Sequence, residues 1–191
     1  FLLLMVLATG CADKSNPLVL SGKTMGTTYR VLIADSTGAI SASEIQNKID
    51  NKLNKINKLM STYDPESEIS RFNRAAPDVP FNLHPDTVKV LAFSLALADQ
   101  TGGAFDPTVG PLVELWGFGS TATTAHPPED HRIQALKQHV GYQSLHLDMD
   151  STTVSSPTKR QLDFSAAAKG FAVDAIATIL VQLGHSSFLV E

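Results

Sequence analysis

The chain has 191 residues, of which 43% are hydrophobic, and its net charge is −4. This length and apolar content are enough for one substantial hydrophobic core. The basic residues are scattered and form no Lys- or Arg-rich face, which argues against a nucleic-acid-binding protein. Cys11 is the single cysteine, so an internal disulfide is excluded.

The N-terminal residues resemble the end of a bacterial lipoprotein signal. Residues 1–7 are all apolar, and Ala8-Thr9-Gly10-Cys11 follows directly. This run is too short to span a bilayer, which takes about 20 residues. We expect residues 1–11 to be the end of a secretory signal peptide with Cys11 as the lipidated residue, and residues 12–18 to be a tether. The alternative is an ordinary signal peptide with a chance cysteine.

The next part of the chain predicts two strands and a long helix. β-branched and aromatic residues over 19–20 and 27–33 are typical of strands, with the glycine-punctuated residues 22–26 between them. A helix is predicted over residues 43–61, with Ser43 as its N-cap and Gln46 completing a capping box. Its apolar face is formed by Ile45, Ile49, Leu53, Ile56 and Leu59 or Met60. The opposite face, with Lys48, Lys52, Lys55 and Lys58, is expected to be solvated.

The later elements are shorter and less regular. A short helix over 67–73 and a loop over 75–82 precede a helix that begins near Pro85 and ends at Gly102-Gly103. Residues 104–119 lack a clean period but are too apolar for a solvent loop, so we expect them to fold back, with Trp116 in the core. A flexible excursion is expected over 121–128. Further elements are a helix over 130–139, strands over 145–148, 152–155 and 160–164 with a hairpin turn at 157–159, a helix ending at 183, and a strand over 187–190.

Residues 161–174 are the stretch that most suggests a ligand site. Asp163 closes a predicted strand, the small residues 165–168 leave the backbone open, and Lys169 follows one turn into a helix. A helix N-terminus with a lysine suits an anionic ligand, and a carboxylate with bare carbonyls suits a metal. The alternative is a strand-to-helix junction in which alanines allow close packing. The six histidines show no metal-ligand spacing and are interpreted as surface or capping residues.

Four segments in order resemble the ApbE family of flavin transferases. They are Gly22-Lys23-Thr24-Met25-Gly26-Thr27, residues 60–65 with 67–73, the run GGAFDPTVGP at 102–111 with LWGFG at 115–119, and residues 163–174. The resemblance covers residues 19–191, taken as the N-terminal portion of the family's domain. It implies an α+β fold with mixed sheets and packed helices, related to the T-fold, with an incomplete C-terminal part.

The resemblance also implies an activity. Members of this family cleave FAD with Mg²⁺ and transfer FMN to a threonine hydroxyl of an acceptor flavoprotein, releasing AMP. The implied partner is a subunit of a membrane redox complex, and the implied location is the periplasmic face of the bacterial inner membrane, with a lipid anchor. FAD pyrophosphatase activity and flavin binding without turnover remain the alternatives.

The site residues follow from the same motifs. Tyr63 resembles the aromatic that packs on the isoalloxazine ring, and Ala166 corresponds to a position whose backbone carbonyl binds Mg²⁺. The resemblance implies further FAD contacts at Met25, Ala104, Phe105, Asp106, Asp163 and Lys169. Ser165 departs from the family, which usually has glycine there. The catalytic base and the other Mg²⁺ ligands are expected beyond Glu191, so this chain alone is expected to be inactive or to bind flavin weakly.

Overall fold

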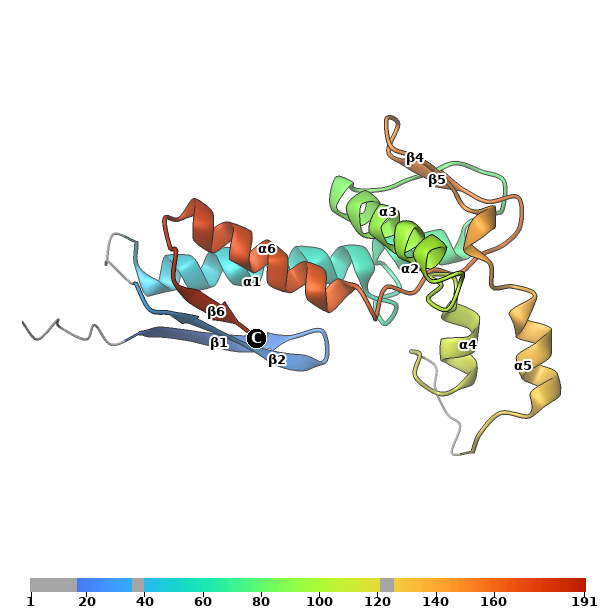
Figure 1. Cartoon of the computed structure of the whole chain (residues 1–191), viewed down its shortest axis with the longest axis horizontal. Helices are drawn as coiled ribbons and strands as arrows, with labels where there is room; N and C mark the ends of the chain where they lie inside the picture. The colour runs from blue at the N-terminus through green and yellow to red at the C-terminus, as the bar shows by residue number, and fades with distance from the viewer. Residues whose placement is uncertain (1–16, 36–39, 121–125) are drawn as a thin grey trace, which may run out of the picture.

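The computed structural model describes residues 17–35, 40–120 and 126–191, and it has an α+β fold, as expected. The molecule has two ends, which we name the sheet end and the loop end (Figure 1). At the sheet end, strands β1, β2 and β6 lie under helices α1 and α6; the loop end holds α2 to α5 and a second small sheet of β3, β4 and β5. Cys11 lies outside the described residues. None of the described helices is long and apolar enough to cross a membrane.

A hairpin of β1 (Leu18–Thr24) and β2 (Thr27–Ile33) begins the sheet end. Thr24 pairs with Thr27, so Met25 and Gly26 form a two-residue turn, and both have positive φ, at 50° and 72°. Such a turn matches the twist of the strands, and glycine adopts it without cost. β1 is longer than predicted and includes most of the glycine-punctuated segment. On its other side β2 pairs antiparallel with β6 (Phe188–Val190), so the predicted strand there is confirmed.

Helix α1 (Ala42–Met60) buries the predicted apolar face: Ile45, Ile49 and Ile56 are at most 1% exposed. The predicted cap was wrong. Ser41 is the N-cap, and Glu44 completes the capping box. Gln46 instead donates to the Tyr29 hydroxyl of β2, which ties the helix to the sheet. Burial next to Asp50 raises the pKa of Tyr29 to about 12, so this hydroxyl stays protonated and donates to Asp50.

Helix α6 (Ala168–Gln182) packs beside α1 on the same sheet, and its C-cap Leu183 is followed by Gly184, which has φ of 87°. Its buried residues are Ala172, Ile176 and Leu180. One of the four predicted solvent-facing lysines is only partly exposed. Lys52 lies between the two ends, 2.7 Å from the Asp86 carboxylate and 5.8 Å from the centre of the Phe171 ring.

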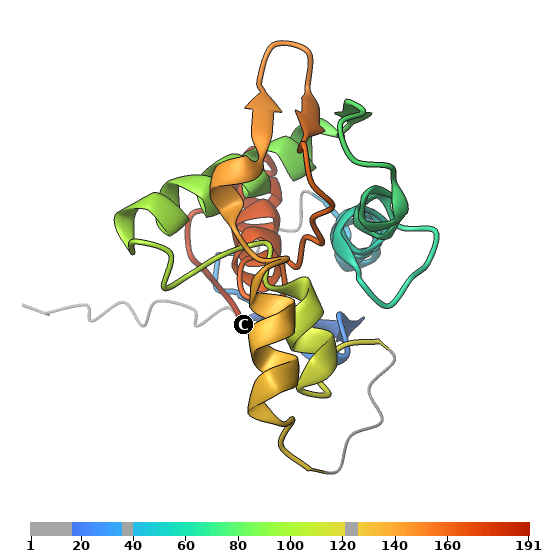
Figure 2. The same ribbon diagram turned by 90° about the vertical axis from the view of Figure 1, so that its right-hand side faces the viewer.

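The loop end contains α2 (Glu68–Arg74), α3 (Pro85–Gln100), α4 (Gly110–Leu115), α5 (Asp130–Lys137) and a 3-10 turn (Tyr142–Ser144). Figure 2 shows α4 and α5 side by side. The small sheet has the order β3-β5-β4, formed by Phe81–Asn82, Thr153–Ser155 and His146–Asp148. β3 lies inside the predicted 75–82 loop, because Phe81 pairs with Val154.

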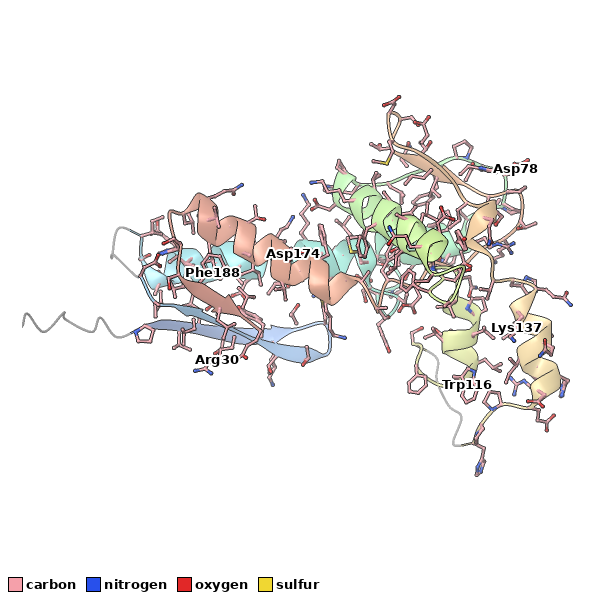
Figure 3. All side chains as sticks on the ribbon, in the orientation of Figure 1. Arg30, Asp78, Trp116, Lys137, Asp174 and Phe188 are labelled. Carbon is pink, nitrogen blue, oxygen red and sulfur yellow. The ribbon has the colours of Figure 1, made fainter. Side chains whose placement is uncertain are left out.

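Two further predictions were wrong. Residues 160–164 form no strand, so the turn at 157–159 joins no hairpin; β5 pairs with β4 and β3 instead. Trp116 is 45% exposed and lies at the outer end of α4, not in the core (Figure 3). His185 does cap α6, because its N–H donates to the Leu180 carbonyl at 3.0 Å, but its side chain is not at the surface. It is buried, with Nδ1 3.3 Å from the Asp35 carboxylate.

Candidate functional site

The segment that carries Asp163 is held by polar bonds where a strand was predicted. The Asn73 side chain of α2 accepts a hydrogen bond from the Leu162 N–H at 2.8 Å and donates to the Leu162 carbonyl at 2.9 Å. On the next residue, the Asp163 N–H donates to the Pro107 carbonyl at 2.9 Å. Asn73 thus does for Leu162 what a neighbouring strand would do, and it satisfies two backbone groups of a fully buried residue.

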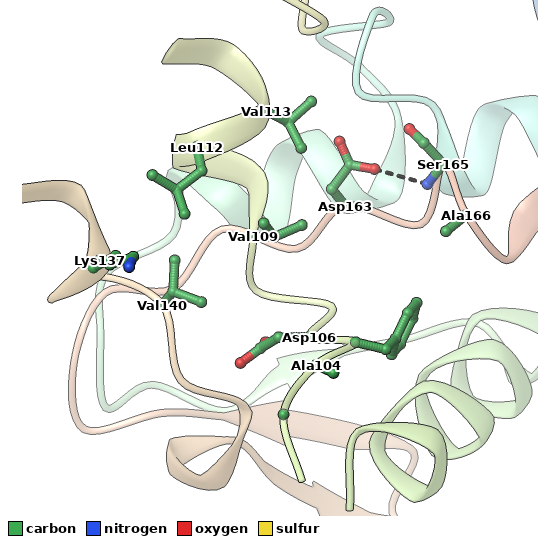
Figure 4. Close-up of a pocket in the computed structure, with 12 residues that line it drawn as sticks. Ala104, Asp106, Val109, Leu112, Val113, Lys137, Val140, Asp163, Ser165 and Ala166 are labelled. Carbon is green, nitrogen blue, oxygen red and sulfur yellow. Dashed lines mark hydrogen bonds between the residues drawn. The ribbon is translucent and has the colours of Figure 1, made fainter. Parts of the chain in front are cut away.

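Asp163 shapes the turn that leads into α6. Its carboxylate is largely buried and accepts a hydrogen bond from the Ser165 N–H at 2.7 Å (Figure 4). The Phe164 carbonyl then accepts from both Ala167 and Ala168, which starts the helix. No hydrogen bond reaches the Ala166 carbonyl or the Ser165 hydroxyl within the described parts of the chain. The turn therefore offers an open carbonyl and an open hydroxyl to a ligand.

On one side of this turn lies a pocket of about 520 Å³, which we name the α4 pocket. Its apolar wall comes from α4 and its neighbours, and Lys137 of α5 lies at its edge (Figure 4). The pocket contains five residues predicted for the site, which are Ala104, Phe105, Asp106, Asp163 and Ala166.

Within the α4 pocket, both carboxylate oxygens of Asp106 accept hydrogen bonds from other residues of the chain. Its Oδ1 accepts hydrogen bonds from the Thr108 N–H at 2.7 Å and the Thr108 hydroxyl at 2.6 Å. Its Oδ2 accepts from the Tyr142 N–H at 3.1 Å. The Thr108 hydroxyl oxygen in turn accepts from the Gly141 N–H at 2.7 Å. Asp106 thus positions the pocket by fastening residues 106–108 to residues 141–142.

On the other side of the turn lies a pocket of about 610 Å³, which we name the α1 pocket. It contains the other three predicted side chains: Met25 from the β1–β2 turn, Tyr63 from the loop after α1, and Lys169 from the first turn of α6. Tyr63 is 64% exposed, and its hydroxyl donates to the Phe118 carbonyl at 2.8 Å. An exposed, anchored ring beside a flexible thioether and an ammonium suits a flat aromatic ligand that carries negative charge.

The predicted residues are therefore brought together, but in two pockets. Among the described residues, Ser165 is the one that lines both. The sequence indicated Ser165 as one of the small residues of the open turn and as a departure from the family. It missed Asn73 and Phe118 as parts of the site, although both lie inside segments that carried the resemblance. A side chain that binds backbone leaves no periodic signal, so Asn73 could not be found from the pattern.

The described residues do not form a complete magnesium site. No group of three or more His, Cys, Asp or Glu side chains in this part of the chain could hold a metal ion. The Asp163 carboxylate and the open Ala166 carbonyl line the same pocket and are oxygen donors of the kind that Mg²⁺ prefers. Because Mg²⁺ takes six ligands, these two fit a contribution to a site and not the whole of one.

Comparison with known proteins gives one consistent result. A profile of the ApbE family matches residues 25–191. A Vibrio cholerae protein named FAD:protein FMN transferase is 37% identical over 188 residues, which are 98% of this chain and 56% of that protein. A Haemophilus influenzae protein of the same name is 38% identical over 95% of this chain and 54% of its own length. The chain thus spans about half the length of these relatives.

Solved structures agree with the sequence relatives. The flavin transferase ApbE from Vibrio cholerae superposes with a TM-score of 0.87 at 37% identity, over 92% of this chain and 57% of that one. The apo form of the Pseudomonas stutzeri flavinyl transferase ApbE has a TM-score of 0.87 at 30% identity, over 94% and 60% of the two chains. The fold, the ordered motifs and these matches together show that the chain belongs to the ApbE family.

Proposed function

We propose that the whole protein transfers FMN from FAD to a threonine hydroxyl of an acceptor flavoprotein and releases AMP. The observation that carries the proposal is the pair of pockets that meet at Ser165. FAD has two ring systems joined by a pyrophosphate, so it needs two ring sites with a phosphate site between them. Both pockets are in the usual range for small ligands, about 300–1,000 Å³. The names of the relatives support the same substrate.

The chemistry of the pockets supports a proposed position for each half of FAD. The isoalloxazine ring belongs in the α1 pocket, where Tyr63 offers an exposed ring face and Met25 a polarizable sulfur. The adenosine belongs against the apolar wall of the α4 pocket. This arrangement brings the pyrophosphate to the turn between them, beside the Ser165 hydroxyl and within the reach of Lys169.

At the phosphorus atom on the FMN side, the proposed reaction breaks one bond and forms one. The threonine oxygen of the acceptor attacks the phosphorus on the FMN side, and the bond from that phosphorus to the bridging oxygen breaks. AMP leaves with the bridging oxygen, the threonine proton goes to a base, and a phosphoester remains. Lys169 stabilises the negative charge that grows on the phosphates, while Tyr63 and Met25 hold the flavin in place. Mg²⁺ would add further charge neutralisation there, and we assign no base among the described residues.

A single incubation tests the proposal against its alternatives. The intact protein is incubated with FAD, Mg²⁺ and an acceptor domain that presents a threonine, and the acceptor is then analysed by mass spectrometry. Covalent FMN on the acceptor supports the proposal. Its Mg²⁺ dependence is supported if no covalent FMN forms when EDTA is present from the start. Release of FMN and AMP without acceptor would instead indicate a pyrophosphatase. Recovery of intact FAD would indicate a flavin-binding protein without turnover.

The proposal includes a location. We propose that Cys11 carries the lipid that holds the protein at the periplasmic face of the inner membrane, next to an acceptor subunit of a membrane redox complex. The support is the apolar run before the single cysteine. In cell fractionation, Cys11→Ser should move the protein from the membrane to the soluble fraction. A Cys11→Ser protein that stays in the membrane fraction would contradict the anchor.

A further inference from the structure

Phe118 is the most exposed large apolar residue in the described parts of the chain, at 75%. It also lines the α1 pocket, together with Tyr63. A ring left this open to water forgoes roughly 2 kcal/mol of burial free energy. Because ligand pockets are lined largely by apolar and aromatic side chains, an exposed aromatic that lines a pocket is a candidate ligand contact.

The backbone of Phe118 is fixed, although its ring is exposed. Helix α4 is followed by Gly117, which has φ of 84° and reverses the chain. The Phe118 N–H then donates to the Val113 carbonyl of α4 at 3.0 Å, as expected for a glycine-terminated helix. The Phe118 carbonyl accepts from the Tyr63 hydroxyl at 2.8 Å. Two independent bonds thus hold this residue at the pocket.

Tyr63 and Phe118 come from distant parts of the sequence and present two rings to one pocket. The described residues contain one close aromatic pair, Phe72 with Phe81, so the rings of Tyr63 and Phe118 do not pack on each other. Tyr63 contacts Phe118 through its hydroxyl, at the far tip of the ring. Both rings therefore keep apolar surface available to a third planar group.

We propose that Phe118 is a second aromatic contact of the isoalloxazine ring, acting with Tyr63. This inference rests on the proposed function, because that function places the flavin in the α1 pocket. Aromatic contacts of this kind are worth about 0.5–1.5 kcal/mol beyond the area they bury. Their loss should weaken binding of every ligand that has the flavin ring and of no ligand that lacks it.

The chain offers a matched control two residues away. Trp116 is also an exposed aromatic, at 45%, but it lines neither the α1 nor the α4 pocket. We would titrate the intact wild-type protein, Phe118→Ala and Trp116→Ala with riboflavin, FAD and AMP by isothermal calorimetry. Phe118→Tyr tests whether any aromatic ring restores binding, and thermal melts confirm that each variant is folded.

The expected result is a rise of about tenfold in Kd for riboflavin and FAD in Phe118→Ala, with recovery in Phe118→Tyr. AMP affinity should be unchanged, and Trp116→Ala should behave as wild type. Unchanged riboflavin affinity in Phe118→Ala, or an equal loss in Trp116→Ala, would overturn the inference while leaving the proposed function intact. A wild-type protein that binds no flavin would overturn both.

Discussion

The two ends of the molecule share one hydrophobic core, but their backbones are fixed in different ways. At the sheet end, apolar faces of α1 and α6 cover the sheet, and the residues between them are almost completely buried. At the loop end, single polar side chains fasten irregular backbone, as Asn73 does for Leu162 and Asp106 for Tyr142. The α1 pocket lies where these ends meet, and the α4 pocket lies at the loop end, beside the turn that leads into α6. A rigid layer thus supports one side of the site, and a network of specific hydrogen bonds supports the other.

The largest expected loss of stability comes from a cavity at the sheet end. Ile49 is fully buried, and Ile49→Ala should lower the free energy of unfolding by about 3–4 kcal/mol, because the removed atoms leave a cavity that cannot collapse. Chemical denaturation measures this loss. Asn51→Ala, at an exposed position on the same helix, should stay within about 0.5 kcal/mol of wild type. A loss below about 1 kcal/mol for Ile49→Ala would contradict the packing argument.

At the loop end, removal of the Asn73 side chain should lower the free energy of unfolding almost as much. Asn73→Ala leaves the N–H and C=O of buried Leu162 without partners, which should cost about 2–3 kcal/mol. Because Asp163 follows Leu162 directly, FAD affinity should also fall. Asn73→Asp keeps the acceptor for the Leu162 N–H but not the donor, so it should be intermediate. If Asn73→Ala is as stable as wild type, the hydrogen-bonded segment does not need this side chain.

The same contrast explains what the sequence could predict. The apolar repeat from Ile45 to Ile56 predicted α1 correctly, because burial of one helical face imposes a period on the sequence. Residues 160–164 were wrongly predicted as a strand, since their β-like pattern gives no sign that Asn73, far away in the chain, would replace a strand partner. Trp116 was placed in the core on its apolarity alone, yet it lies at the exposed end of a short helix. The site motifs predicted candidate residues but not their division between two pockets, which depends on the fold.

A substitution at the turn between the pockets separates chemistry from folding. Asp163→Asn keeps an oxygen that can accept the Ser165 N–H, so the melting temperature should change little. The loss of the negative charge should reduce FMN transfer at least tenfold, or about 1.4 kcal/mol. Transfer assays and thermal melts on the same preparation measure both. Equal losses of stability and transfer would show that Asp163 has only a structural role.

The smallest effect concerns the ion pair between the two ends, Lys52 of α1 with Asp86 of α3. Burial opposes ionisation of Asp86, but the hydrogen bond and charge of Lys52, together with the charges of His84 and Lys55, hold the pKa of Asp86 below its usual 3.8. A carboxylate whose pKa is lower in the folded state stabilises the fold fully above its unfolded-state pKa, near 3.9, and this contribution is lost as pH falls through the folded-state value.

Lys52→Met should therefore cost about 1 kcal/mol at pH 7, measured by urea denaturation. The difference from wild type should stay constant down to about pH 5 and shrink below about pH 4, when Asp86 becomes protonated. Lys58→Met removes an exposed lysine of the same helix and should show no such pH dependence. A difference that stays constant down to pH 2 would mean that Lys52 acts through its packing near Phe171 and not through Asp86. The charge of Lys52 would then add nothing to the apolar contact between α1 and α3, and the contrast between the two ends would not extend to this part of their boundary.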